Sequence, residues 1–165
     1  MKKYSLVFIA LLAMFVLAAC GGSKEEGASA DKEEKNSEPT TITYESENGP
    51  VEVPADPQRV LVLSSFAGNV MALDVPLVGV DSWSKMNPRF EEKLEGVEEV
   101  TDENLEKIIE LDPDLIVGLP NIKNVEKLKE IAPTVTYTYG KVDYLTQHIE
   151  IGKLLNKEEE AQTWV

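Results

Sequence analysis

The chain has 165 residues, with 30 acidic and 16 basic side chains, and its formal net charge at pH 7 is −14. Nucleic acids are bound mainly through lysine and arginine, so this acidity argues against a nucleic-acid partner. One histidine and one cysteine cannot supply the cluster of soft ligands that a transition-metal site needs.

The first 19 residues have the pattern of a secretory signal peptide. A basic start with Lys2 and Lys3 precedes an unbroken apolar run over residues 6–19. This run is shorter than the roughly 20 apolar residues that a membrane-spanning helix needs. We therefore expect residues 1–19 to direct export and to be removed.

The only cysteine, Cys20, stands directly after the apolar run. The stretch Leu17-Ala18-Ala19-Cys20 resembles the lipobox of bacterial lipoproteins, in which the cysteine is acylated, for example with palmitate, and becomes the new N-terminus. A disulfide at Cys20 is disfavoured because there is no second cysteine. More than one acyl chain gives lasting membrane attachment. We therefore predict a lipid anchor at Cys20 on the extracytoplasmic face of a bacterial cell membrane.

Residues 20–39 are rich in glycine, serine, alanine, lysine and glutamate and contain no apolar cluster. Such a segment cannot bury enough surface to offset its ordering entropy, so we predict a lipidated, flexible tether. The residues that follow, about 125 in number, suffice for a single domain with its own core.

The remaining sequence predicts strands that alternate with helices. Residues 42–54 alternate around Asn48-Gly49, which is typical of a β-hairpin. Apolar, β-branched runs predict strands at 59–63, 76–80, 115–117 and 135–139, and helical patterns predict helices at about 68–73, 88–94, 104–111, 124–131 and 144–155. Asn156 is predicted to cap a last helix that reaches residue 165. This alternation predicts an α/β fold with a central parallel sheet flanked by helices.

Ligands of such sheets bind at the carboxyl ends of the strands. The segments that follow the predicted strands carry aromatic, amide and hydroxyl groups and few cations, at 64–69, 81–85, 118–121 and 139–141. Neither glycine-rich phosphate-binding pattern occurs. We therefore expect a ligand site of modest polarity there.

No catalytic group stands out. A nucleophile needs a base beside it and a third group to orient the base. The only histidine, His148, falls in the middle of a predicted helix, where we expect it at the surface or at a boundary. The carboxylates fall mainly on charged helix faces, which are usually solvated. We therefore predict no catalytic residue and no enzyme.

Two long stretches resemble the N-terminal lobe of class III substrate-binding proteins of ABC importers, in the iron-siderophore and cobalamin group. They are RVLVLSSFAGNVMALDVPLVGVDSW and VTDENLEKIIELDPDLIVGLPNIKNVEKLKEIAPTV. GVDSWSKMNPRF and TYGKVDYLTQHIEIGKLLNKEEEA are most similar to ferric-hydroxamate binding lipoproteins of Gram-positive bacteria. The resemblance implies a Rossmann-like N-terminal lobe over 40–155, the start of an interlobe helix over 156–165, and a missing second lobe in a truncated chain.

The resemblance also implies a function. A lipid-anchored, monomeric receptor would capture a ferric hydroxamate siderophore and deliver it to a membrane permease driven by an ATPase. The siderophore chelates iron with its own oxygens, so the protein needs no cofactor and no metal ligands, only aromatic walls and a few donors. Two alternatives remain: another cargo (a catecholate siderophore, haem or cobalamin), or a truncated lipoprotein that binds a protein through its acidic face.

Six residues are predicted to contact the ligand. Trp83 is the first candidate for a cleft wall, although it could instead cap the sheet, and Tyr139 ends a strand on which Tyr137 packs into the core. Loop structure or helix capping is the alternative for several of the others. Val100 stands where some hydroxamate binders have an arginine, which leaves Lys85, Lys141 or the second lobe to supply a cation. The six are Trp83, Tyr139, Phe66, Asn69, Asn121 and Lys141.

Glu106, in the stretch NLEK, matches the family glutamate that docks on arginines of the permease. Charge complementarity of this kind speeds and orients association. The alternative is an ordinary solvent-facing helix residue. We therefore expect Glu106 to lie on an exposed helix face.

Overall fold

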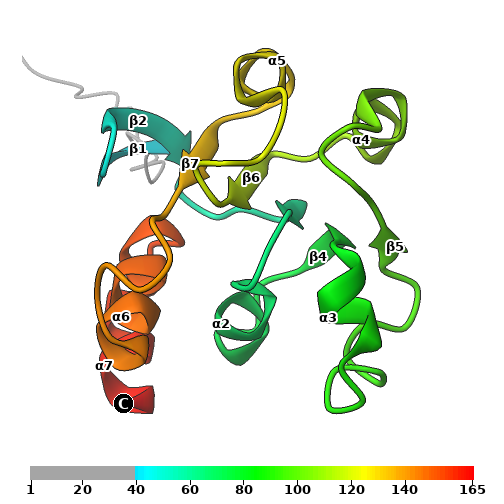
Figure 1. Cartoon of the computed structure of the whole chain (residues 1–165). Coiled ribbons are helices and arrows are strands. Elements are labelled where there is room, and N and C mark those ends of the chain that lie inside the picture. Colours follow the sequence, from blue (N-terminus) through cyan, green and yellow to red (C-terminus); the bar gives the residue numbers. More distant parts are fainter. Residues whose placement is uncertain (1–39) are drawn as a thin grey trace, which may run out of the picture. The chain divides into compact units, whose positions relative to one another are not determined.

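A computed structural model of the protein describes residues 40–165, and Figure 1 shows its elements. The predicted signal peptide, Cys20 and the predicted tether lie outside the described residues. The strands are β1 (Thr41–Ser46), β2 (Gly49–Pro54), β3 (Val60–Val62), β4 (Leu77–Val80), β5 (Glu98–Glu99), β6 (Leu115–Gly118) and β7 (Thr134–Thr136). The helices are α2 (Ala67–Ala72), α3 (Ser82–Met86), α4 (Leu105–Leu111), α5 (Val125–Ile131), α6 (Tyr144–Leu154) and α7 (Glu158–Trp164).

Five strands form a parallel sheet in the order β5-β4-β3-β6-β7. Helices α2, α3 and α6 lie on one side of it, and α4 and α5 lie on the other (Figure 1). The predicted α/β fold with a central parallel sheet is therefore confirmed. Among the described helices, none is long and apolar enough to cross a membrane.

The sheet separates two apolar cores because successive strand residues point to opposite faces. Val60 and Val62 of β3 pack with α2 and α6, whereas Leu61 packs with α4 and α5. Every residue of β3 is fully buried, as expected for a strand covered on both faces.

The predicted hairpin is also confirmed. Strands β1 and β2 pair antiparallel around the turn, from Thr41 opposite Pro54 to Ser46 opposite Gly49. Gly49 takes a left-handed backbone conformation (φ 105°), which glycine adopts without strain. The Asn48 side chain donates to Thr136 Oγ1 at 3.0 Å, and so ties the hairpin to the edge strand β7.

The stretch Asp112-Pro113-Asp114 forms the connection from α4 to β6. Helix α4 ends at Asp112 in a left-handed conformation (φ 46°), and Arg59 Nε donates to the Asp112 carbonyl at 2.8 Å. The Asp114 carboxylate accepts from the backbone N–H groups of Gln58 at 2.6 Å and Arg59 at 3.0 Å. These contacts satisfy carbonyl and N–H groups that a helix end and a strand start otherwise leave free.

One predicted helix is wrong. Residues 88–94 form turns, and the helix of this region is the earlier α3. The reason is capping: the Asp81 carboxylate accepts from Ser84 N–H at 2.9 Å and starts a helix directly after β4. The two-residue strand β5 was not predicted, because two exposed glutamates carry no strand pattern.

Two boundaries also differ from expectation. Strand β7 ends at Thr136, so the predicted strand over 135–139 is too long and Tyr139 lies in the loop that follows. Asn156 does not cap the last helix. It is in a left-handed conformation (φ 56°), its side chain donates to the Ala55 carbonyl at 3.2 Å, and Lys157 holds the cap position of α7.

Candidate functional site

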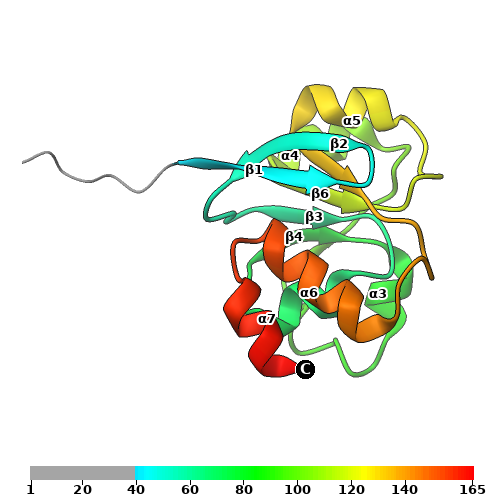
Figure 2. The ribbon, with the colours of Figure 1, turned by 90° about the vertical axis from the view of Figure 1, so that its left-hand side faces the viewer.

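A pocket of about 180 Å³ lies at the carboxyl edge of the sheet. It joins the loop after β3, the start of α2, the loop after β7 and the first turns of α6. Figure 2 shows the β7–α6 connection and the start of α6 at the edge to which strands β3 and β6 point. The lining residues are Ser65, Phe66, Asn69, Tyr139, Gly140, Val142, Tyr144 and Gln147.

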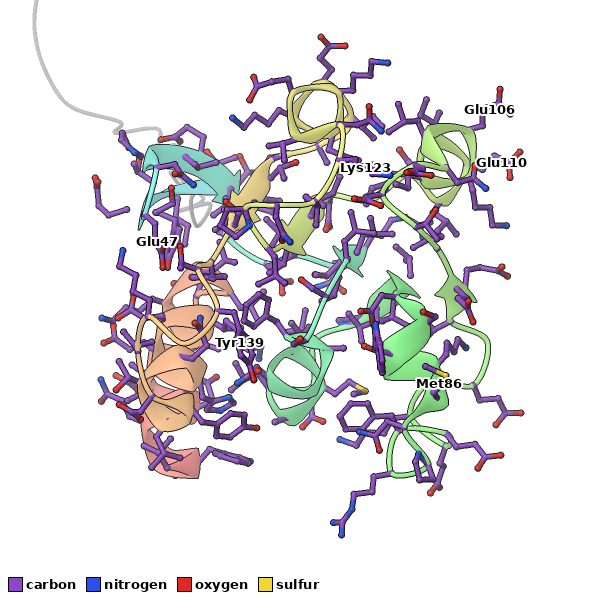
Figure 3. All side chains as sticks on the ribbon, in the orientation of Figure 1. Glu47, Met86, Glu106, Glu110, Lys123 and Tyr139 are labelled. Atoms are coloured by element: carbon purple, nitrogen blue, oxygen red, sulfur yellow. The ribbon has the colours of Figure 1, made fainter. Side chains whose placement is uncertain are left out.

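Three of the six predicted ligand contacts, Phe66, Asn69 and Tyr139, line this pocket together. Tyr139 is 75% exposed, and in Figure 3 its label lies between α6 and α2. The turn that carries it needs Gly140 in a left-handed conformation (φ 74°). Tyr139 therefore offers an exposed aromatic ring from a loop rather than from a strand end.

Phe66 forms the floor of the pocket and belongs equally to the core. It is buried, and its ring packs edge-on against Tyr137 with the ring centres 5.5 Å apart. The Tyr137 hydroxyl donates to the Tyr44 hydroxyl at 3.0 Å, and burial raises the pKa of Tyr137 well above its ordinary value. The prediction that Tyr137 packs in the core is confirmed.

Asn69 of α2 is held from behind by the only histidine. Its side chain is 2% exposed, and its Nδ2 lies 3.3 Å from Nδ1 of His148. His148 is completely buried, so its predicted surface or boundary position is wrong. The reason is that α6 is covered by α2 on one side and by α7 on another, where the Trp164 ring lies 4.5 Å from the imidazole. Burial lowers the pKa of His148.

Three buried side-chain atoms around the pocket lack a hydrogen-bond partner among residues 40–165: Ser64 Oγ, Gln147 Nε2 and His148 Nε2. Ser64 precedes the lining residue Ser65, Gln147 is itself a lining residue, and His148 contacts Asn69. Buried polar groups are usually paired in folded proteins. Of the three residues only Gln147 lines the pocket, and a molecule bound there can supply a partner for its Nε2.

Residues 64–165, more than half of the chain, match the family model described as periplasmic binding protein. The chain belongs to the periplasmic binding protein family. Members of this family bind solutes, and the likeness to them is that of a binding protein rather than an enzyme.

Individual relatives show which members of the family this chain resembles. The iron(3+)-hydroxamate-binding protein FhuD of Bacillus subtilis is 38% identical over 99% of this chain and 52% of its own length. The structure of unliganded FhuD2 from Staphylococcus aureus has a TM-score of 0.71 at 32% identity, over 75% of this chain and 46% of that one. FhuD2 with bound ferrioxamine B has a TM-score of 0.62 at 30% identity, over 66% and 43%. The chain thus spans about half the length of these relatives.

The other three predicted ligand contacts do not line the pocket. Trp83 lies on α3 and is 77% exposed, so it does not cap the sheet. Asn121 is exposed in the turn after β6. Lys141 follows the lining residue Gly140, and its Nζ lies 3.4 Å from the Glu47 carboxylate in the hairpin turn. Lys85, the other expected cation, donates to the Leu94 carbonyl at 2.9 Å.

The pocket contains residues of α6 that were not predicted from the sequence. Asp143 starts this helix by accepting from Leu145 N–H at 3.0 Å and Thr146 N–H at 3.1 Å. Tyr144 and Gln147 are then three residues apart and face the same side. The predicted helix over 144–155 already begins where α6 begins, but the face that it turns to the pocket depends on its packing against α2 and α7, which no local pattern indicates.

Glu106 lies away from the pocket, in the first turn of α4 on the opposite side of the sheet from α2 and α6 (Figure 3). The Asn104 side chain caps this helix by accepting from Lys107 N–H at 3.1 Å. Glu106 is exposed, as expected. In the described part of the chain, no group of three or more His, Cys, Asp or Glu residues is placed to hold a metal ion.

Proposed function

We propose that this chain captures a ferric hydroxamate siderophore outside the cell and serves an ABC importer. The observation that carries the proposal is the pocket at the carboxyl edge, which combines aromatic rings with Gln147, whose buried Nε2 has no partner within residues 40–165. A chelated iron brings its own ligands, so such a wall suffices for recognition. The proposal is supported by the similarity to the hydroxamate-binding FhuD and to FhuD2, which was solved with ferrioxamine B.

The size of the pocket suggests how much of the ligand it receives. Its volume of about 180 Å³ is smaller than the roughly 300 Å³ at the lower end of small-molecule sites. It would therefore take one side of a siderophore. We propose that residues 40–155 are one lobe of the binding protein, that residues 156–165 begin the interlobe helix, and that a second lobe supplies the remaining contacts.

The anchor is the second part of the proposal. Residues 1–19 would be removed as a signal peptide, Cys20 would be acylated, and residues 20–39 would tether the lobe to the outer face of the cell membrane. Growth with a labelled fatty acid tests this directly. We expect label in the wild-type protein and none in Cys20→Ser, while label in Cys20→Ser would reject the site.

Docking on the permease is the third part. Glu106 is exposed on α4, on the side of the sheet away from α2 and α6, and so leaves the pocket free for cargo. We expect Glu106→Lys to abolish siderophore uptake by cells and to leave ferrioxamine B affinity unchanged. Glu91→Lys, an exposed acidic residue in the turns after α3, is the matched control. Equal uptake by both variants would reject a docking role for Glu106.

The cargo is tested by fluorescence titration of the full-length gene product without the residues before Ser23. Ferrioxamine B, a ferric catecholate, haem and cobalamin would be added in turn, and tryptophan fluorescence, to which this chain contributes Trp83 and Trp164, would be followed. We expect saturable quenching by the hydroxamate. Saturation by another cargo would keep the importer and replace its ligand, whereas no saturation in a folded protein would favour a partner protein instead.

Substitutions of the predicted ligand contacts test where the siderophore binds. Tyr139→Ala should weaken ferrioxamine B binding about tenfold, the equivalent of about 1.4 kcal/mol, because the ring is the most exposed wall of the pocket. Trp83→Ala tests whether the cleft extends to α3, and loss of quenching there would support the predicted wall. Asn121→Ala and Lys141→Ala test the remaining predicted contacts. Unchanged affinity in Tyr139→Ala would move the site away from this pocket.

A further inference from the structure

Two buried polar side chains meet behind the pocket wall. Asn69 comes from α2 and lines the pocket, and His148 comes from α6 and is completely buried. Their contact, Asn69 Nδ2 to His148 Nδ1 at 3.3 Å, joins residues that are 79 positions apart in sequence. The histidine does not line the pocket itself, so any effect it has on a ligand passes through Asn69.

The two atoms in contact, an amide Nδ2 and an imidazole Nδ1, imply one chemical state for each side chain. The Nδ2 group of an amide has only protons to offer, so Nδ1 of His148 must accept, and the imidazole must be neutral with its proton on Nε2. The Asn69 amide is planar, and with Nδ2 engaged its other arm, Oδ1, points away from the histidine. An amide can direct either its oxygen or its nitrogen toward the pocket, and here the contact with His148 determines which of the two it is.

We propose that His148 is a positioning residue, whose neutral imidazole holds Asn69 with Oδ1 available to the pocket, where it accepts a hydrogen bond from an N–H group of the ligand. This inference rests on the proposed function and adds the ligand's chemistry at one point. The ligand carries an amide or ammonium N–H beside its chelated iron. A ligand with only oxygen acceptors on that side would find no donor in Asn69.

Protonation of the histidine would reverse this arrangement. An imidazolium carries protons on both nitrogens, so its Nδ1–H would face the Nδ2–H of Asn69. The pair then separates, or the amide rotates and turns Nδ2 toward the pocket. Either change removes the acceptor that the ligand N–H requires, so affinity falls in acid.

The surroundings of His148 favour the neutral form at neutral pH. Helix α2 carries no charged residue, and α7 places the uncharged Trp164 against the ring. The charged groups of α7, Glu158, Glu159 and Glu160, are exposed, and on α6 Glu150 is paired with Lys153 at 2.9 Å. Burial is the cause that lowers the pKa of His148, so protonation is expected below its ordinary value of 6.5.

The experiment measures ferrioxamine B affinity of the full-length gene product between about pH 5 and pH 7.5, the window in which histidine titrates. Wild type should lose about tenfold in affinity toward acid. His148→Gln keeps an amide oxygen that can accept from Asn69, and should bind like wild type at neutral pH with no pH dependence. His148→Phe keeps a ring against Trp164 but has no acceptor, and should bind several-fold more weakly at every pH.

The variants share the ligand with wild type, so ionisation of the ligand appears equally in all of them. Thermal unfolding confirms that each variant is folded. A wild-type pH slope in His148→Gln, or wild-type affinity in His148→Phe, would overturn the positioning role while leaving siderophore binding intact. The two failures are therefore distinguishable.

Nitrogen NMR of the imidazole in the wild-type protein gives a test that needs no ligand. We expect a neutral ring at pH 7 with the proton on Nε2 and a bare Nδ1. A proton on Nδ1 would overturn the inference directly. If no ferric siderophore binds a folded wild-type protein, the proposed function fails and the ligand part of the inference fails with it, while the Nε2–H form would still establish the pairing with Asn69.

Discussion

The polar groups at the two ends of the parallel sheet differ in whether they have hydrogen-bond partners. At the amino end, Asp114 accepts two backbone N–H groups at the start of β3, and Arg59 donates to the carbonyl of Asp112 at the end of α4. At the carboxyl end, Ser64, Gln147 and His148 each bury a polar atom that has no partner within residues 40–165. We call the amino end, where these polar groups are paired, the closed end of the sheet, and the carboxyl end, where three are unpaired among residues 40–165, the open end.

This difference separates folding from binding. A buried donor or acceptor without a partner costs about 1–3 kcal/mol. The amino end avoids that cost with short contacts inside the chain. The carboxyl end carries it at three side chains, and of these Gln147 lines the pocket, where a ligand can supply a partner. Substitutions at the amino end should therefore cost stability, and those at the carboxyl end should affect binding.

The largest loss of stability is expected where α6 turns back into α7, near the closed end. A Cβ atom on Gly152 would overlap the Ala161 Cβ and lie 3.0 Å from the Lys157 carbonyl oxygen. Gly152→Ala should therefore cost about 3 kcal/mol of unfolding free energy, as overpacking does, measured by urea unfolding. The double variant with Ala161→Gly removes the methyl overlap and should recover part of the loss. A fully stable Gly152→Ala would show that the helices can move apart.

The next largest effect tests the closed end itself. Asp114→Ala leaves the N–H groups of Gln58 and Arg59 without their acceptor, and should cost about 2 kcal/mol of unfolding free energy. Asp114→Asn is the matched control, because its amide oxygen still accepts one N–H, and it should cost about half as much. If the alanine variant loses nothing, water replaces the carboxylate and the closed end contributes less than the contacts suggest.

Much of the fold was predictable because its signals are local. The hairpin follows from Asn48-Gly49, and the strands that cross the core follow from runs such as residues 59–63, which are apolar throughout because both faces are covered. The errors also have local causes. The predicted helix over 88–94 was displaced because Asp81 caps an earlier one, and Asn156 uses its side chain on Ala55 instead of on α7.

The site was less predictable because it depends on packing between distant segments. Phe66, Asn69 and Tyr139 line the pocket at the carboxyl edge, as their positions after or at the end of predicted strands indicated, although β7 ends at Thr136 and Tyr139 lies in the following loop. The burial of His148 depends on how α2 and α7 pack against α6, and no local pattern indicates that. Gln147 was missed for the same reason.

A smaller effect is expected at the open end, in the pH dependence of stability. Burial lowers the pKa of His148 in the folded chain. Between this lowered pKa and the ordinary value of about 6.5, the unfolded chain therefore binds more protons than the folded chain. Stability is therefore complete above about pH 6.5 and falls with acid through that window, by about 1.4 kcal/mol per unit of pKa difference. His148→Gln should lack this component of the slope, measured by urea unfolding at each pH. The carboxylates titrate in both proteins, so identical slopes would mean that the folded chain protonates His148 freely.

The smallest change in stability is expected for Ser64→Ala, and its sign is informative. The Ser64 hydroxyl is buried without a partner among the described residues, so removing it should leave the unfolding free energy within about 0.5 kcal/mol of wild type or raise it. Thr134, also buried, is the matched residue at the amino end, where its hydroxyl donates to the Ala132 carbonyl at 2.9 Å. Thr134→Val should cost about 1 kcal/mol.

Ser64→Ala and Thr134→Val together give a stronger test when ferrioxamine B affinity is measured as well as stability. If the open end is incomplete because it awaits a ligand, Ser64→Ala should keep or gain stability and lose affinity for ferrioxamine B, while Thr134→Val should lose stability and keep affinity. A Ser64→Ala variant that loses stability must have lost a bond inside the chain, and the carboxyl end would then be as closed as the amino end. Opposite signs in the two variants would locate binding and folding at opposite ends of one sheet.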